Sequence, residues 1–145
     1  MSELSSSTVR IEAPASEVSA ILKDLEAYPT WSTSIRSVEV NERDGAGNPS
    51  KVQVKVEAGP LKDSVSLSYD WSEAPGKIAF TLEDANLLTE MTGAYIVKDN
   101  GDDTTDVTYQ LKVAISMPVP EMMRKKQEEA TIQLALAQLK ARAEG

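Results

Sequence analysis

Most of the chain alternates apolar and polar residues with a period of two, which is the pattern of half-buried β-strands. Residues 51–56 show it most clearly, because Val52, Val54 and Val56 alternate with polar side chains. The same pattern predicts six further strands, near residues 8–12, 35–41, 64–71, 77–82, 87–98 and 107–117. Short polar turn sequences separate the last six strands. We therefore expect an antiparallel meander with one apolar and one polar face.

Two other segments show the 3.6-residue period of an amphipathic helix. The first begins at Pro14, carries an apolar stripe from Val18 to Leu25, and ends before Pro29. A short turn or a second small helix is expected directly after it. The second segment, residues 121–143, has neither Gly nor Pro and is rich in strong helix formers. It predicts one helix about 35 Å long.

The predicted order of elements is strand, helix, six strands and a long helix. The apolar face of a sheet must be covered, and only the final helix is long enough to cover it. A strongly bent sheet that grips a helix cannot close along its whole length. We therefore expect a single α+β domain, residues 1–145, in which apolar side chains at the open end line a cavity.

The residue types that are missing limit the chemistry of this chain. It contains no Cys and no His, which excludes disulfides, thiolate nucleophiles, Cys-based zinc sites and Ser-His-Asp triads on this chain alone. Oxygen atoms could still bind a metal, but we expect neither a metal nor a cofactor.

The charge and the apolar runs limit the partners and the location. The net charge is −8, which argues against nucleic acid and against an anionic membrane surface. No apolar run approaches the ~20 residues that span a bilayer, and the first residues lack the features of a signal peptide. We therefore expect a cytoplasmic protein without stable membrane insertion.

Three short sequences, together with the order of elements, resemble a known superfamily. Residues 9–14 resemble its first strand and the start of its first helix, residues 25–31 contain a Tyr-Pro-x-Trp segment, and residues 118–120 resemble the corner before its last helix. The superfamily is the helix-grip group of START-related and polyketide cyclase/dehydrase-like domains, often called SRPBCC. Within it, the chain looks most similar to the small bacterial branch that includes coenzyme Q-binding relatives.

This resemblance implies a fold and a class of ligand. The fold is a curved seven-stranded antiparallel sheet wrapped around a long C-terminal helix, with two short helices after the first strand and a deep apolar cavity. Members bind lipids, sterols, quinones, plant hormones or polyketide intermediates. Some catalyse cyclisation or dehydration, and many only carry or sense a ligand. The partner implied for this chain is a hydrophobic small molecule: a lipid, a quinone or a polyketide-like compound.

Apolar and aromatic side chains on the predicted inner faces are the candidates for contact with such a ligand. A Tyr hydroxyl in a dry cavity needs a partner, and Met adapts to irregular apolar pockets. The candidates are Trp31, Val54, Tyr69, Trp71, Phe80, Met91, Tyr95, Tyr109, Met117, Met122 and Met123. Packing in the core is the more common role of such residues, and both roles stay open here. Gly93 indicates either a bulge or the close approach of another backbone or a ligand.

A polyketide aromatase/cyclase or dehydratase is the alternative to a binding protein. The resemblance implies that cyclases supply an arginine from an inner strand face, but no arginine lies between residues 51 and 97. Arg36 is a candidate substitute, because alternation would place it on the face of Val38 and Val40, and Glu90 is a candidate acid. A regulatory module, in which the ligand alters a partner surface, is a third class.

The polar run 124–129 lies in the predicted long helix. We interpret it as a solvated helix face with i,i+4 ion pairs, with membrane docking through its three cations as the alternative. The apolar surface of the same helix is wide and includes Leu134, which fits a monomer or a weak homodimer.

Overall fold

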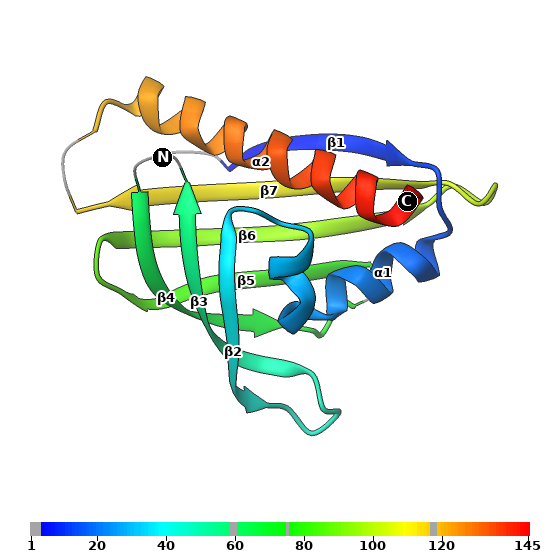
Figure 1. Ribbon diagram of the computed structural model, residues 1–145, viewed down its shortest axis with the longest axis horizontal. Coiled ribbons are helices and arrows are strands. Elements are labelled where there is room, and N and C mark those ends of the chain that lie inside the picture. The colour runs from blue at the N-terminus through cyan, green and yellow to red at the C-terminus, as the bar shows by residue number, and fades with distance from the viewer. Residues whose placement is uncertain (1–3, 59–60, 75, 117–118) are drawn as a thin grey trace.

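The computed structural model describes residues 4–58, 61–74, 76–116 and 119–145. The elements in chain order are β1 (Ser5–Ile11), α1 (Ala15–Lys23), the 3₁₀ helix η1 (Leu25–Thr30), β2 (Ile35–Arg43), β3 (Pro49–Ala58), β4 (Leu61–Asp70), β5 (Lys77–Ala85), β6 (Leu88–Asp99), β7 (Thr105–Ile115) and α2 (Glu121–Glu144). Figure 1 shows α2 lying along the sheet. The predicted helix-grip fold is confirmed.

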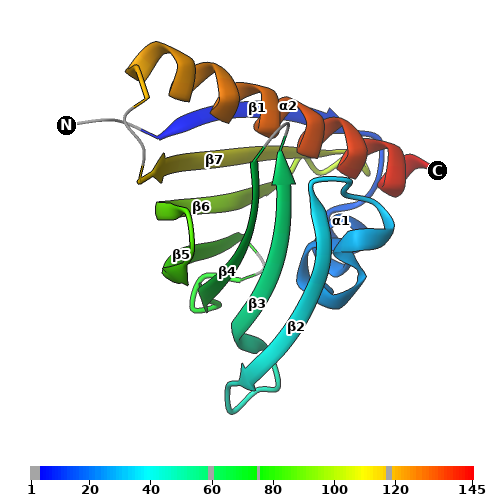
Figure 2. The same cartoon turned by 60° about the vertical axis from the view of Figure 1, so that its left-hand side comes forward.

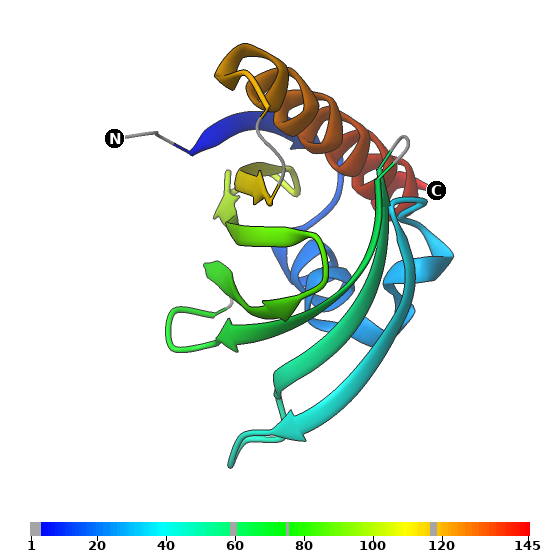
Figure 3. The same cartoon turned by 90° about the vertical axis from the view of Figure 1, so that its left-hand side faces the viewer.

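The seven strands form one antiparallel sheet in the order β1-β7-β6-β5-β4-β3-β2. Strands β2 to β7 are a meander, as the alternation predicts, and β1 pairs with β7 at the far edge. Register shifts interrupt β2, the β4–β5 pair and the start of β6, and such bulges increase local twist. The sheet is consequently strongly curled, with α2 lying along one side of it, as the end view of Figure 3 shows.

The long helix packs on one side of this curved sheet, against β1 and β7 (Figure 2). Its buried residues share a single stripe, namely Glu128, Ile132, Ala135, Leu136 and Leu139. Polar contacts fasten it to β1, since Gln133 Nε2 donates to Ser7 Oγ at 2.8 Å and Lys140 Nζ donates to the Arg10 carbonyl at 2.8 Å. Strands β1 and β7 are therefore the strands that hold α2 on the sheet.

The two ends of the curled sheet differ. At the end where α2 finishes, which we call the closed end, α1, η1 and the C-terminal half of α2 fill the interior. Leu22, Ile78 and Leu139 there have no exposed surface. At the other end, which we call the open end, α2 begins, β7 finishes, and β4 and β6 start (Figure 1).

Candidate functional site: an apolar cavity beneath the final helix

A cavity of about 610 Å³ lies between the concave face of the sheet and the N-terminal half of α2. This volume falls within the range of small-molecule sites. Three valines of β3 form part of its wall, Val52, Val54 and Val56. Their side chains alternate inward along the strand and are short, so they leave space that longer residues would fill. Leu25 and Tyr28 of η1 close the cavity toward the closed end.

The cavity reaches the surface at the open end. Val119 and Met123 both line it and are 38% and 61% exposed. Ile115, at the end of β7, lines the same region. The opening therefore lies between the first turn of α2 and the end of β7.

Seven of the residues predicted from the sequence lie on the cavity wall. They are Val54, Tyr69, Phe80, Met91, Tyr95, Tyr109 and Met123. All but Met123 belong to the strands β3 to β7, where the inward face follows from the alternation. Their contact with a ligand stays a prediction, since the structure gives their placement only.

Three other candidates, described next, are not among the residues that line the cavity. Trp31 is buried behind the wall, with its ring 4.9 Å from that of Tyr28. Trp71 follows the end of β4 and donates from Nε1 to the Pro49 carbonyl at 2.6 Å. Met122 is 73% exposed, because it occupies the outer side of α2 next to the inward Met123. Met117 lies outside the described residues.

Arg36 does not share the inner face, contrary to the prediction. The register of β2 shifts between Ile35 and Ser37, which breaks the alternation at that point. Arg36 is consequently exposed and lies 3.6 Å from Glu57 Oε2. It lines a second recess of about 350 Å³ on the outer side of the gap between β2 and α2. Glu90, the other catalytic candidate, lies outside the cavity wall and pairs with Lys112 at 3.3 Å.

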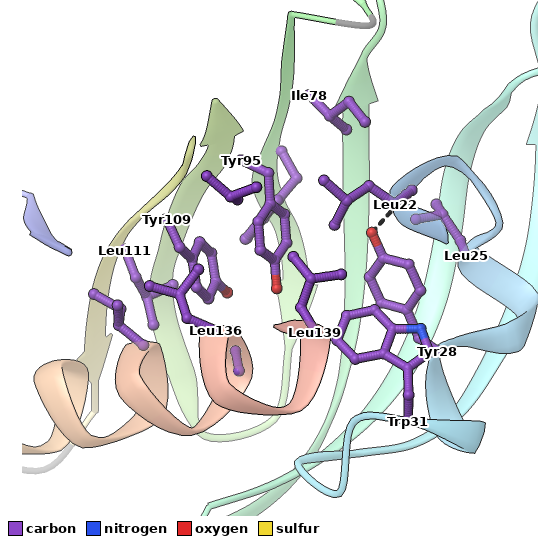
Figure 4. Packing of buried hydrophobic residues seen from close by; sticks show 14 of the residues in the cluster. Leu22, Leu25, Tyr28, Trp31, Ile78, Tyr95, Tyr109, Leu111, Leu136 and Leu139 are labelled. Carbon is purple, nitrogen blue, oxygen red and sulfur yellow. Dashed lines mark hydrogen bonds between the residues drawn. The ribbon is translucent and has the colours of Figure 1, made fainter. Parts of the chain in front are cut away.

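The hydroxyl groups of three tyrosines supply the polar character of the sheet wall. Tyr95 and Tyr109 are paired across β6 and β7, and their rings stack with centroids 4.2 Å apart. Figure 4 shows both hydroxyl groups pointing toward α2. Tyr69 lies beside Phe80, with ring centroids 5.5 Å apart. Of the four tyrosines, all within the described residues, only Tyr28 uses its hydroxyl in a hydrogen bond, donating to the Leu22 carbonyl at 2.6 Å.

Burial determines the protonation of these phenols. Desolvation raises the pKa of Tyr69, Tyr95 and Tyr109 above the ordinary tyrosine value, and the neighbouring phenols raise that of Tyr69 and Tyr95 further. Near neutral pH they are therefore neutral hydroxyl groups. They can donate hydrogen bonds to an acceptor in the cavity, and they are poor proton donors in the acid–base sense.

Gly93 marks a close approach within the cavity wall. A Cβ at this position would lie 2.6 Å from the Gln110 carbonyl oxygen and 2.7 Å from Cζ of Phe80. The Phe80 ring therefore lies over the glycine, and no register shift occurs there. Of the two sequence-based interpretations, the close approach is correct, and the approaching groups belong to the protein itself.

The polar run at the start of α2 is partly buried, and its interpretation as a solvated face is wrong for two residues. Glu128 is 2% exposed, although it is a carboxylate. Its Oε2 accepts from the Val113 backbone N–H at 2.6 Å and from Arg124 Nη1 at 2.7 Å, and its Oε1 accepts from Ser5 Oγ at 2.8 Å. Both charged residues line the cavity.

The spacing along α2 explains this placement. Counting back in fours from Leu136 gives Ile132, Glu128 and Arg124, which continues the buried apolar stripe into the polar run. The spacing along the helix thus indicated that these two residues face the interior. Their charged side chains favoured the opposite prediction, an exposed helix face. Gln127 and Thr131, which also line the cavity, were missed for the same reason.

Within the described ranges, the structure has neither a metal-binding cluster of three or more carboxylates nor a helix long and apolar enough to span a membrane.

Residues 4–144 match the family model described as polyketide cyclase / dehydrase and lipid transport. The chain therefore belongs to this family. A comparison with curated proteins gave no match.

Several solved structures share the fold. A START superfamily protein from Mycobacterium smegmatis is 26% identical, with a TM-score of 0.92 over 99% of this chain and 98% of that one. The Zhui aromatase/cyclase from a Streptomyces species is 19% identical, with a TM-score of 0.78 over 97% and 93%. A Thermus thermophilus protein is also 19% identical, with a TM-score of 0.82 over 97% and 96%. At 19% identity, the last two indicate a shared fold and not a shared reaction.

Proposed function

We propose that this protein binds a hydrophobic small molecule, such as a lipid, a quinone or a polyketide-like compound, in the cavity beneath α2. The observation that supports the proposal is the cavity itself, which has about 610 Å³ of space, an apolar strand wall and an opening at Met123. Protein interiors are normally packed without large voids. An empty apolar space of this size is therefore better explained by a ligand than by loose packing.

The polar groups on the wall fit a binding role. Three neutral phenols can donate hydrogen bonds to an oxygen atom of the ligand and so fix its orientation. Glu128, the one carboxylate among the described residues of the wall, is occupied by three hydrogen-bond donors. It is thus poorly placed to remove a proton from a substrate.

Catalysis as an aromatase/cyclase or dehydratase is the second candidate. It is favoured by the similarity in fold to the Zhui aromatase/cyclase and by phenol hydroxyls that could stabilise an enolate oxygen. Against it, Arg36 and Glu90 both lie outside the cavity wall. We therefore place this candidate below binding without turnover.

We further propose that the chain acts as one domain in the cytoplasm, as a monomer or weak homodimer, without nucleic acid or an inserted membrane segment as partner. These proposals rest on the net charge and the sequence patterns.

Native mass spectrometry of the purified protein tests the binding proposal first, because a co-purified ligand adds mass. Titration with menadione, a fatty alcohol and a flavone follows, read by tryptophan fluorescence. Trp71 stacks on Tyr69 with ring centroids 5.8 Å apart, so a ligand against Tyr69 should alter its emission. No response to any of these probes in the folded protein would count against binding.

A matched pair of variants places the ligand. Ala135 lines the cavity and is buried, whereas Ala137, on the same helix, is exposed. Ala135→Phe fills part of the space and is expected to weaken binding of any responding probe by about tenfold or more. Ala137→Phe is expected to leave binding unchanged. Equal binding by both variants would place the ligand elsewhere.

A further inference from the structure

The described residues that line the cavity include only two with charged side chains, Arg124 and Glu128. They form one ion pair, with Arg124 Nη1 2.7 Å from Glu128 Oε2. The side chains are 17% and 1% exposed, so the pair is largely removed from water. The part of the cavity wall that the structure describes therefore carries no net charge.

The structure holds Glu128 in place more firmly than its partner. Glu128 accepts hydrogen bonds from β1 and β7 as well as from Arg124, which fixes its position. Among the described residues, the side chain of Arg124 pairs only with two residues of α2, Glu128 and the exposed Glu121, the latter at 3.6 Å. Arg124 directly follows Met123, which lies at the opening of the cavity.

We propose that Glu128 determines the charge selectivity of the cavity: by neutralising Arg124, it makes the cavity select uncharged ligands over organic anions of the same shape. This inference rests on the proposed binding function. It adds to it that the ligand is neutral and carries an oxygen acceptor, such as a carbonyl or hydroxyl group.

The physical reason is the balance of buried charge. An anionic ligand at Arg124 would bring a second negative charge beside Glu128, and either the ligand or Glu128 would then lack a cation. A carboxylate deeper in the cavity would meet uncharged described residues such as the phenols, and a buried charge without an opposite charge is costly. An uncharged ligand meets neither penalty, and its oxygen can accept from the hydroxyls of Tyr95, Tyr109 or Tyr69.

The test uses two probes of nearly identical shape, 1-pyrenebutanol and 1-pyrenebutyrate, titrated at pH 7.5 and read by pyrene fluorescence and calorimetry. We expect the unmodified protein to bind the alcohol at least about tenfold more tightly than the acid, which corresponds to about 1.4 kcal/mol. Equal or tighter binding of the acid would overturn the inference and leave the binding function standing. Binding of neither probe would count against the binding function itself.

The decisive variant is Glu128→Gln, which is nearly isosteric. Its amide oxygen can still accept from the Val113 N–H, and its amide nitrogen can donate to Ser5 Oγ. Arg124 then lacks its buried counter-charge, and we expect the affinity for the acid to rise about tenfold while that for the alcohol changes much less. The matched control is Glu121→Gln, which removes the exposed partner of the same arginine and should leave the ratio of affinities unchanged.

A second variant keeps the inference testable if Glu128→Gln does not fold, which circular dichroism would reveal. Arg124→Gln leaves the carboxylate without its cation, and the ratio should then shift further toward the alcohol. An unchanged ratio in a folded Glu128→Gln or Arg124→Gln protein would overturn the role assigned to Glu128.

Discussion

The closed and open ends of the curled sheet are held together by different interactions. At the closed end, apolar side chains such as Leu22, Ile78 and Leu139 are fully buried against one another. At the open end, where the cavity takes the place of a core, two buried carboxylates connect the strand ends. One is Glu128, described above, and the other is Asp63 at the start of β4.

Asp63 shows how a strand end is fixed without apolar packing. Its carboxylate accepts from the backbone N–H groups of Ser64, Asn86, Leu87 and Leu88, at 2.8 to 3.2 Å. Burial tends to raise the pKa of this carboxyl, but the four backbone donors outweigh it and the pKa is lowered overall. The comparison indicates that polar contacts can stabilise a wall that has space behind it.

The largest effect is expected at the closed end. Leu139→Ala removes a fully buried side chain between α2 and the sheet and should lower the free energy of unfolding by about 2–5 kcal/mol. Leu134→Ala, at a position 43% exposed on the same helix, should change it by less than about 0.5 kcal/mol. Urea denaturation measures both. A small effect at Leu139 would mean that this end is not the main source of stability.

The next largest effect on stability is expected at the open end, where the Asp63 carboxylate and not apolar packing fixes the strand ends. Asp63→Asn replaces a carboxylate that accepts from four N–H groups with an amide that has one acceptor oxygen. We expect a loss of about 1–3 kcal/mol of unfolding free energy at pH 7, again from urea denaturation. Asp84→Asn, at an exposed position on β5, is the control and should have little effect.

The same variant has a predicted pH dependence. Because the pKa of Asp63 is lowered in the folded protein, its stabilising contribution is complete above the unfolded-state pKa of about 3.9. It is lost as the pH falls through the lower folded-state pKa. The difference in stability between the unmodified protein and Asp63→Asn should therefore shrink on acidification. A constant difference across this pH window would contradict the assignment.

The smallest expected effect is on ligand binding, and it separates a residue of the cavity wall from a residue of the core. Met123 lines the cavity near its opening and Met122 points away from it. Met123→Ala should weaken binding of 1-pyrenebutanol by about fivefold, through loss of apolar contact. Its effect on stability should stay within about 0.5 kcal/mol. Met122→Ala should alter neither, and equal effects on binding would remove Met123 from the ligand contact surface.

The sequence was sufficient to predict the fold and the inward face of the strands. Alternation over residues such as Val52 and Val54 depends only on the period of a strand, so it holds wherever the register is regular. It failed at Arg36, where a register shift that the sequence does not reveal changes the direction of the side chain. The sequence pattern could not show whether Trp31 packs in the core or lines the cavity, because buried and cavity-lining aromatic residues follow the same pattern.

The polar part of the cavity was missed for a different reason. Charged residues are usually exposed, so residues 124–129 favoured a solvated face, and only the spacing from Leu136 pointed to Arg124 and Glu128. Burial of Glu128 becomes favourable only when Ser5 and Val113 supply donors. These partners are 123 and 15 residues away in sequence, beyond the range of any local pattern.

The pairing of β1 with β7 has a consequence for how the molecule forms. Ser5 pairs with Leu111 and Ile11 with Thr105, so the first strand has no neighbour until nearly the whole sheet exists. During synthesis, β1 cannot pair until β7 has been made, and α2, which covers the cavity, is made after β7. We therefore expect the binding space to be assembled in the last steps of folding, with closure of the sheet limiting the rate because such distant segments must meet.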